Sequence, residues 1–139
     1  MADIVDRRTR SRMMSGIKGK NTKPERVVRS YLHRSGLRFR LHDRSLPGSP
    51  DLVFRQHNTI VQVHGCYWHQ HPGCRFAYSP KSNAKFWREK LSGNVIRDRK
   101  NAAKLRRLGW RVLTVWECQV HRHEVLERLA NRIRSVNGA

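Results

Sequence analysis

The segment from Val63 to Cys74, VHGCYWHQHPGC, concentrates side chains that bind metal ions. They are histidines and cysteines, with two aromatic residues set among them: His64, Cys66, Tyr67, Trp68, His69, His71 and Cys74. Cys66, His71 and Cys74 have the spacing C-x4-H-x2-C. A structural zinc ion usually takes four Cys or His ligands in a tetrahedron. A loop that supplies three ligands therefore needs a fourth from elsewhere in the chain.

Cys118 is the third of the three cysteines and follows the hydrophobic stretch WRVLTVWE. If that stretch is a strand beside TIVQVHG (59–65), the Cys118 thiol reaches the loop. We therefore predict a closed structural zinc site from the three loop ligands and Cys118. His121 and His123 stay open as alternative fourth ligands, and three unrelated thiols in a reduced protein are the other interpretation. A catalytic zinc needs an open coordination position, so four such ligands argue against a zinc hydrolase.

A second site is indicated by Asp51, which follows LPGSP at the start of a predicted strand. Pro-Asp at a strand start, then a hairpin and a polar pair at i and i+2, recurs in nucleases. There the Asp binds magnesium and the next strand normally carries Glu-x-Lys, whereas this chain has Gln62-Val63-His64. A neutral Gln62 leaves Asp51 as the main carboxylate, and a backbone carbonyl can supplement it. One carboxylate can suffice, because magnesium keeps several waters and uses the substrate phosphate.

The zinc assignment leaves His64 and His69 unused, and we interpret them as facing a magnesium site at Asp51. A histidine titrates near neutral pH, so His69 can take a proton from an attacking water. The alternative for His69 is an ordinary surface histidine. Glu25 needs no further role, because Thr22 and Glu25 form a capping-box pattern at a helix start.

The elements that must position these residues are read from hydrophobic periodicity and turn residues. The order α-β-β-β-α-β-α predicts an α/β fold with a mixed sheet flanked by helices. The second and third strands should pair as a hairpin, and the long helix is expected to break near Gly93. The predicted helices cover 22–36, 82–109 and 124–136, and the predicted strands cover 37–42, 51–55, 59–65 and 110–117.

The chain has 139 residues and a net charge of +20, from 30 Lys and Arg against 10 Asp and Glu. Such a charge predicts a polyanionic partner, with nucleic acid first and an anionic membrane surface second. No apolar run approaches membrane-spanning length and no secretory signal is apparent, so we expect a cytoplasmic protein. Residues 1–22 form a basic arm, either a solvated tail or a DNA-ordered segment whose apolar residues touch bases.

Several motifs in one register resemble the very short patch repair (Vsr) DNA mismatch endonucleases. The resemblance covers nearly the whole chain, so a single domain over 1–139 with the basic arm 1–22 is expected. The motifs that carry it are TRSRMMSGIKGKNTKPE, LPGSPD, HGCYWHQHPGC, FWREKLSGNVIRD and GWRVLTVWEC.

The resemblance implies a restriction-endonuclease-like fold with a structural zinc. It implies a magnesium-dependent nick in one strand, 5′ to the thymine of a T·G mismatch, in repair of deaminated 5-methylcytosine. The implied partners are double-stranded DNA with a T·G mismatch and mismatch-repair proteins. We expect a monomer in the bacterial cytoplasm, associated with the nucleoid and not with a membrane.

By similarity, Asp51 and the carbonyl of Val63 bind magnesium, His69 is the general base, and His64 and Glu25 support the site. The zinc ligands match those predicted from spacing. The implied DNA-binding residues form an aromatic wedge, two arm positions and two positions near the mismatched bases: Tyr67, Trp68, Trp87, Met14, Ile17, Lys90 and Asn94. Tyr67 departs from the Phe familiar in the family. Without the resemblance Trp87 would be assigned to the core, as we assign Trp110 and Trp116.

Two other functions remain as alternatives. A non-catalytic zinc-stabilised DNA-binding module explains the charge and the zinc ligands, but not Asp51 with two spare histidines. A restriction-type or HNH-like nuclease would cut both strands of a matched duplex, although we find no Asn-His arrangement typical of HNH enzymes.

Overall fold

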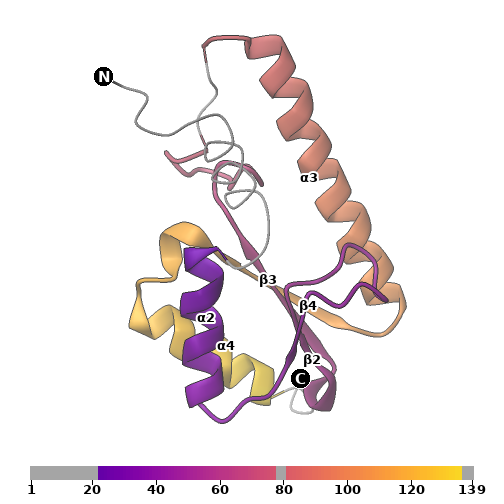
Figure 1. Ribbon diagram of the computed structural model, residues 1–139, viewed down its shortest axis with the longest axis vertical. Coiled ribbons are helices and arrows are strands. Elements are labelled where there is room, and N and C mark those ends of the chain that lie inside the picture. Colours follow the sequence, from indigo (N-terminus) through magenta and orange to yellow (C-terminus); the bar gives the residue numbers. More distant parts are fainter. Residues whose placement is uncertain (1–21, 78–80, 136–139) are drawn as a thin grey trace, which may run out of the picture.

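The computed structural model describes residues 22–77 and 81–135 (Figure 1). Its helices and strands follow the predicted order α-β-β-β-α-β-α, so the predicted mixed α/β architecture is confirmed. They are α2 (Lys23–Arg34), β1 (Arg40–Leu41), β2 (Leu52–Phe54), β3 (Thr59–His64), α3 (Ala84–Arg107), β4 (Arg111–Trp116) and α4 (His123–Arg134). Two short 3-10 helices, η1 (Arg55–His57) and η2 (Glu117–Gln119), follow β2 and β4. None of the helices in these ranges is long and apolar enough to cross a membrane.

The four strands form one sheet in the order β1-β2-β3-β4. β2 pairs antiparallel with β1 and with β3, which confirms the predicted hairpin. β3 and β4 run parallel, because the helix α3 carries the chain back between them. Their register pairs His64 with Trp116. Both strands therefore end at the same edge, where the loop with the predicted metal ligands leaves β3 and Cys118 follows β4.

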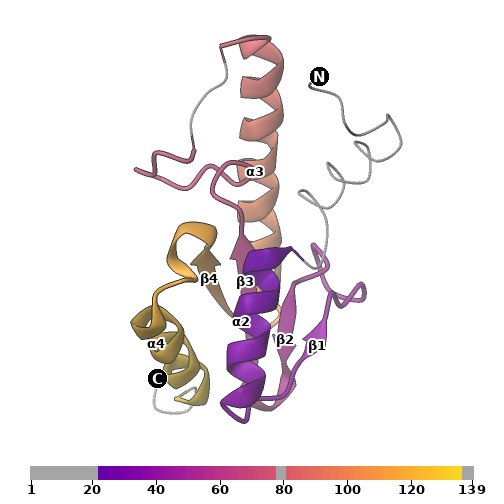
Figure 2. The same cartoon turned by 60° about the vertical axis from the view of Figure 1, so that its left-hand side comes forward.

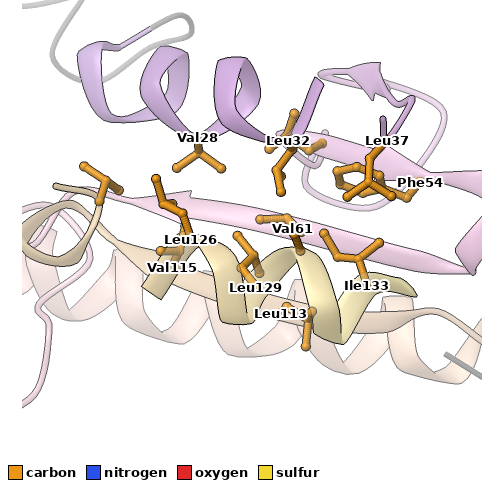
Figure 3. Packing of buried hydrophobic residues seen from close by; sticks show 13 residues of the cluster. Val28, Leu32, Leu37, Phe54, Val61, Leu113, Val115, Leu126, Leu129 and Ile133 are labelled. Atoms are coloured by element: carbon orange, nitrogen blue, oxygen red, sulfur yellow. The ribbon is translucent and has the colours of Figure 1, made fainter. Parts of the chain in front are cut away.

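Alternate residues of the strands face two separate hydrophobic clusters, as the strand period of two requires. Leu52, Val61 and Leu113 face α2 and α4 in the larger cluster, which Figure 3 shows. Val53 and Ile60 face Leu105 of α3 in the smaller one. The sheet is thus covered by α2 and α4 on one face and by the C-terminal part of α3 on the other. Trp110 packs against the smaller cluster, as predicted.

Local sequence explains the helix α2 well. The Thr22 hydroxyl accepts a hydrogen bond from the Glu25 N–H at 3.3 Å, and Pro24 lies in the first turn. Val28 and Leu32 are fully buried on one face, and Gly36 adopts a φ of +92° just beyond the helix. The first strand, in contrast, is shorter than predicted: only Arg40–Leu41 pair with β2, rather than 37–42.

The expected break of the long helix near Gly93 is wrong. The helix α3 runs for 24 residues without interruption. An interior glycine costs only about 1 kcal/mol relative to alanine, and good helix formers on both sides offset that cost. The N-terminal half of α3 extends beyond the sheet (Figures 1 and 2). In this part of the helix Asn94 donates a hydrogen bond to the carbonyl of Trp68, in the loop after β3.

Candidate active site and metal centre

A cleft of about 1520 Å³ opens where the N-terminus of α2, the ends of β2 and β3, the loop after β3 and the helix α3 meet. The side chains predicted to do chemistry line it together with aromatic residues of the loop. The predicted site residues that line the cleft are Glu25, Asp51, Val63, His64, Tyr67, Trp68, His69 and Cys118.

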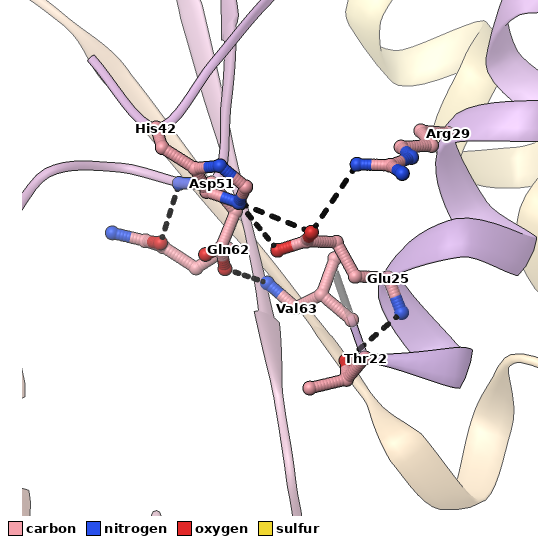
Figure 4. A network of polar contacts seen from close by, with 7 residues as sticks. All are labelled: Thr22, Glu25, Arg29, His42, Asp51, Gln62 and Val63. Atoms are coloured by element: carbon pink, nitrogen blue, oxygen red, sulfur yellow. Dashed lines mark hydrogen bonds and ion pairs between the residues drawn. The ribbon is translucent and has the colours of Figure 1, made fainter. Parts of the chain in front are cut away.

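Asp51 lies directly before β2 and is held by backbone and side-chain contacts to β3 (Figure 4). Its carboxylate accepts a hydrogen bond from the Val63 N–H at 2.8 Å, and its own N–H donates to Gln62 Oε1 at 3.3 Å. The pKa of Asp51 is raised from 3.8 to about 6, mainly by burial and in part by the nearby Glu25 carboxylate. The Val63 N–H acts in the opposite direction. An anionic Asp51 is therefore costly here unless a cation compensates it.

Glu25 does more than begin a helix. Its carboxylate is almost fully buried and accepts from His42 Nε2 at 3.0 and 3.1 Å, one contact to each oxygen. Arg29 approaches the same carboxylate at 3.5 Å. Ligand atoms of Glu25, His42 and Asp51 all lie within 4.8 Å of one another, so the two carboxylates and the ring form one compact group. Sequence reasoning missed His42, which carries no motif of its own.

His64 and His69 form a stacked pair, with ring centroids 3.9 Å apart and planes 4° from parallel. His69 Nδ1 lies 2.6 Å from Oδ2 of Asp98, a residue of α3 that sequence reasoning also missed. Such a carboxylate partner favours the tautomer with a proton on Nδ1, which leaves the Nε2 lone pair free. The pKa of His64 is lowered to about 4, mainly by burial and in part by the neighbouring His69. His64 therefore stays neutral beside His69 at neutral pH.

The four predicted zinc ligands come together at the sheet edge. Cys66, His71, Cys74 and Cys118 have ligand atoms within 4.8 Å of one another. His71 Nδ1 lies 3.7 Å from Cys66 Sγ and 3.5 Å from Cys118 Sγ. Nitrogen and sulfur ligands at about 2.0 and 2.3 Å from one tetrahedral ion would be about 3.5 Å apart. The spacing fits zinc, and all three thiols are free cysteines.

The alternative fourth ligands lie outside this group. His121 and His123 are both exposed, and His123 Nδ1 lies 3.7 Å from Glu127 on the same helix. Neither belongs to the set of side chains grouped around His71. Among the described residues, the geometry therefore favours Cys118.

Trp116, which we assigned to packing, contacts both sites instead of the core. Its ring stacks on His71 at 4.2 Å with an interplanar angle of 11°. It also meets His64 edge-on at 5.2 Å. The indole thus lies between the Cys/His group and the stacked pair of His64 and His69, and it links the position of one to the other.

The aromatic residues of the predicted wedge are grouped between the loop and α3. The ring centroids of Tyr67 and Trp68 are 5.1 Å apart, and those of Trp68 and Trp87 are 6.0 Å apart. Lys90 Nζ lies 5.8 Å from the centre of the Trp87 ring. Trp87 is therefore not a core residue. Phe86, which sequence reasoning missed, adjoins Trp87 at 5.3 Å and has 57% of its surface exposed.

The predicted arm contacts cannot be located in the same way. Met14 and Ile17 lie outside the described residues.

Comparisons with known proteins show the class of protein to which the chain is similar. Two similar proteins are named as type II nicking enzymes. V.XorIIP of Xanthomonas oryzae pv. oryzae is 45% identical over 132 residues, 94% of this chain and 96% of that protein. V.NmeAIP of Neisseria meningitidis is 40% identical over 140 residues, 100% of this chain and 99% of that protein. The chain is thus an enzyme of the DNA endonuclease class.

The family follows from two further matches. A family model described as DNA mismatch endonuclease Vsr matches residues 2–75. The DNA mismatch endonuclease Vsr of Escherichia coli (strain K12) is 43% identical over 135 residues, 96% of this chain and 86% of that protein. The chain belongs to the Vsr DNA mismatch endonuclease family, which confirms the resemblance recognised in its motifs. Membership argues against a non-catalytic DNA-binding module.

Proposed function

We propose that this enzyme nicks one DNA strand 5′ to the thymine of a T·G mismatch, in a magnesium-dependent reaction that repairs deaminated 5-methylcytosine. The observation that carries the proposal is the cleft. It holds an acidic site at Asp51, a histidine with a carboxylate partner, and aromatic side chains of the loop beside them. Each of these parts has a separate task in cutting a strand at a weakly stacked position.

The donor set around Asp51 fits magnesium. Asp51 and the carbonyl of Val63 would hold the ion, and Glu25 would support it through bound water, since magnesium prefers oxygen ligands and keeps several waters. When bound, the ion supplies positive charge to the scissile phosphate. The raised pKa of Asp51 supports this assignment, because a buried carboxylate next to a second one needs a cation to stay ionised.

His69 is the proposed general base. Asp98 holds the Nδ1 side of the ring at 2.6 Å, so Nε2 can accept the proton of an attacking water. His64 stacks on the same ring and fixes its plane. Because His64 is neutral at neutral pH, the positive charge that develops on His69 meets no second imidazolium.

The Cys/His group would hold a structural zinc. His69 lies in the chain between the ligands Cys66 and His71, so closing this loop on an ion fixes the backbone that carries the proposed base. The proposed role of the ion is thus to order the loop, with no vacant position for substrate.

Recognition is proposed to rest on the rings of Tyr67, Trp68 and Trp87. Wedging them into the duplex unstacks bases, and this costs less at a mismatch than at a paired step. Lys90 and Asn94 would lie near the mismatched bases, and Met14 and Ile17 would enter the minor groove from the arm. We further propose a monomer that acts on nucleoid DNA in the cytoplasm together with mismatch-repair proteins.

The test uses duplexes that are identical except for one T·G or T·A pair, with each strand labelled separately. A single nick 5′ to the mispaired thymine, only with magnesium and absent in Asp51→Ala, is expected. Cleavage of both strands of the matched duplex would instead make this a restriction-type nuclease. Undiminished cleavage by Asp51→Ala would show that the metal site is elsewhere.

A further inference from the structure

His42 is a largely buried polar side chain to which no motif assigns a role. It follows β1, where its N–H donates to the Asp51 carbonyl at 3.1 Å. Its φ of +48° lies in the left-handed region, which histidine, asparagine and aspartate adopt more readily than most residues. His42 is thereby fixed at both ends: its backbone is held by Asp51 and its ring by Glu25.

The contact between His42 and Glu25 controls the orientation of the carboxylate. His42 Nε2 is within 3.0 and 3.1 Å of the two Glu25 oxygens, whereas Arg29 approaches at 3.5 Å. The Glu25 side chain is 3% exposed and that of His42 is 12% exposed. In Figure 4 the ring of His42 lies beside Asp51 and points to the Glu25 carboxylate. A rotation of the carboxylate about its last bond would break one of the two contacts.

His42 stands behind the site rather than in it. Glu25 and Asp51 are among the residues that line the cleft, and His42 is not. Its Nε2 is already engaged by Glu25, so the ring is placed to orient a carboxylate and not to meet an ion directly.

We propose that His42 is a positioning residue that holds the Glu25 carboxylate toward Asp51 and so increases the affinity of the site for its divalent ion. This inference rests on the proposed magnesium site. A hydrated ion at Asp51 presents water molecules to its surroundings, and an oriented Glu25 accepts hydrogen bonds from them. A carboxylate that could rotate would accept hydrogen bonds from these water molecules only part of the time.

Three substitutions of His42 separate the effect of its hydrogen bond to Glu25 from the effect of its backbone strain. Glutamine carries its amide nitrogen the same number of bonds from Cα as Nε2 of histidine, so His42→Gln keeps a donor to Glu25. His42→Ala removes it, and both variants carry a similar strain at positive φ. His42→Asn also loses the contact, because it is one bond shorter, but asparagine tolerates the left-handed region. His33→Ala, an exposed histidine on α2, is the control.

Two measurements are needed. The first is the magnesium dependence of single-turnover nicking. The second is the binding of Mn²⁺ to the protein without DNA, measured by electron paramagnetic resonance. We expect His42→Ala and His42→Asn to raise the half-saturating magnesium concentration by about 10–100-fold, as for other groups that support metal ligands. Mn²⁺ binding should weaken in parallel. The rate at saturating magnesium and the affinity for DNA should stay close to the wild-type values. The half-saturating magnesium concentration should also stay close to the wild-type value in His42→Gln and His33→Ala.

The inference is overturned if His42→Asn keeps the wild-type metal dependence. It is also overturned if His42→Gln is impaired as much as His42→Ala, since the ring itself would then be required. The Asp51→Ala variant distinguishes this failure from that of the proposed function. An inactive Asp51→Ala beside a normal His42→Asn removes only the role of His42, whereas an active Asp51→Ala removes the metal site as a whole.

Discussion

Replacing Asp51 with asparagine should stabilise the magnesium-free protein at neutral pH while it abolishes nicking. The pKa of Asp51 is raised from 3.8 to about 6, mainly by burial. The folded state therefore binds the Asp51 proton more tightly than the unfolded state does. This favours folding fully below the unfolded pKa of 3.8, and the benefit is lost as the pH rises through about 6. Above that pH the folded protein carries a buried anion.

The size of the effect follows from the pKa rise. One pKa unit is worth about 1.4 kcal/mol, so a rise from 3.8 to about 6 corresponds to about 3 kcal/mol. Asparagine keeps an oxygen that can accept the Val63 hydrogen bond, so little else is lost. Its neutral amide also leaves Glu25 without a neighbouring negative charge. We expect Asp51→Asn to raise the free energy of unfolding by about 1–3 kcal/mol at pH 7.5.

The measurement is urea unfolding at several pH values from 4 to 8, in buffer prepared without magnesium. A chelator is avoided because it would also remove zinc from the proposed Cys/His site. The difference between the variant and the wild type should grow from pH 4 to about pH 6 and then stay constant. Added magnesium should stabilise the wild type more than Asp51→Asn, because only the wild type offers the ion a carboxylate.

Asp43 provides a control of opposite sign. Hydrogen bonds from Ser45, and then the charge of Arg55, lower the pKa of Asp43. Its contribution is therefore present above its ordinary pKa and lost as the pH falls, so Asp43→Asn should not stabilise the protein at neutral pH. If the stability difference between Asp51→Asn and the wild type is the same at pH 4 and pH 7.5, the reasoning about a buried anion is refuted.

Three further substitutions test the rest of the site. Asp98→Asn should slow single-turnover nicking by about 10²–10⁴, because His69 loses the partner that fixes its tautomer, while DNA affinity stays constant; a normal rate would remove Asp98 from the mechanism. Cys118→Ser should lower both the zinc content measured by metal analysis and the melting temperature, and full retention of zinc would point to His121 as the fourth ligand. Trp68→Ala should weaken binding to T·G duplexes by about 1–3 kcal/mol relative to T·A duplexes, with an unchanged salt dependence. Equal weakening on both duplexes would mean that the ring only packs the loop.

Much of the fold was predictable because the decisive signals are local. The β-branched residues of 51–55 and 59–65 and the turn between them predict the hairpin, and the capping residue Thr22 predicts the start of α2. The need of three loop ligands for a fourth also carried long-range information. Cys118 can supply that fourth ligand only if β4 lies beside β3, and the parallel pairing of the two strands meets this condition.

The pairs that support the proposed site could not be predicted from local signals. His42 is 17 residues from Glu25, and Asp98 is 29 residues from His69. Each contact exists only because β1 and α3 lie where the completed fold puts them. The sequence contains one signal at Asp98, which is an acidic residue between two arginines in the stretch RDRK. The sequence contains no such signal at His42, because a single polar residue after a short strand is ordinary.

The acidic groups in the cleft have a charge opposite to the net charge of the whole molecule. The chain carries +20, yet Glu25, Asp51 and Asp98 all line the cleft where, on the proposed function, a DNA phosphate would be cut. The surrounding Lys and Arg residues attract any duplex, while the carboxylates repel the phosphate that comes nearest to them. A divalent ion at Asp51 would reverse that local repulsion, so metal and scissile phosphate should each raise the affinity of the site for the other. On the proposed function, the protein can therefore bind duplex DNA broadly through its basic surface and still complete the cutting site only when ion and substrate are both present.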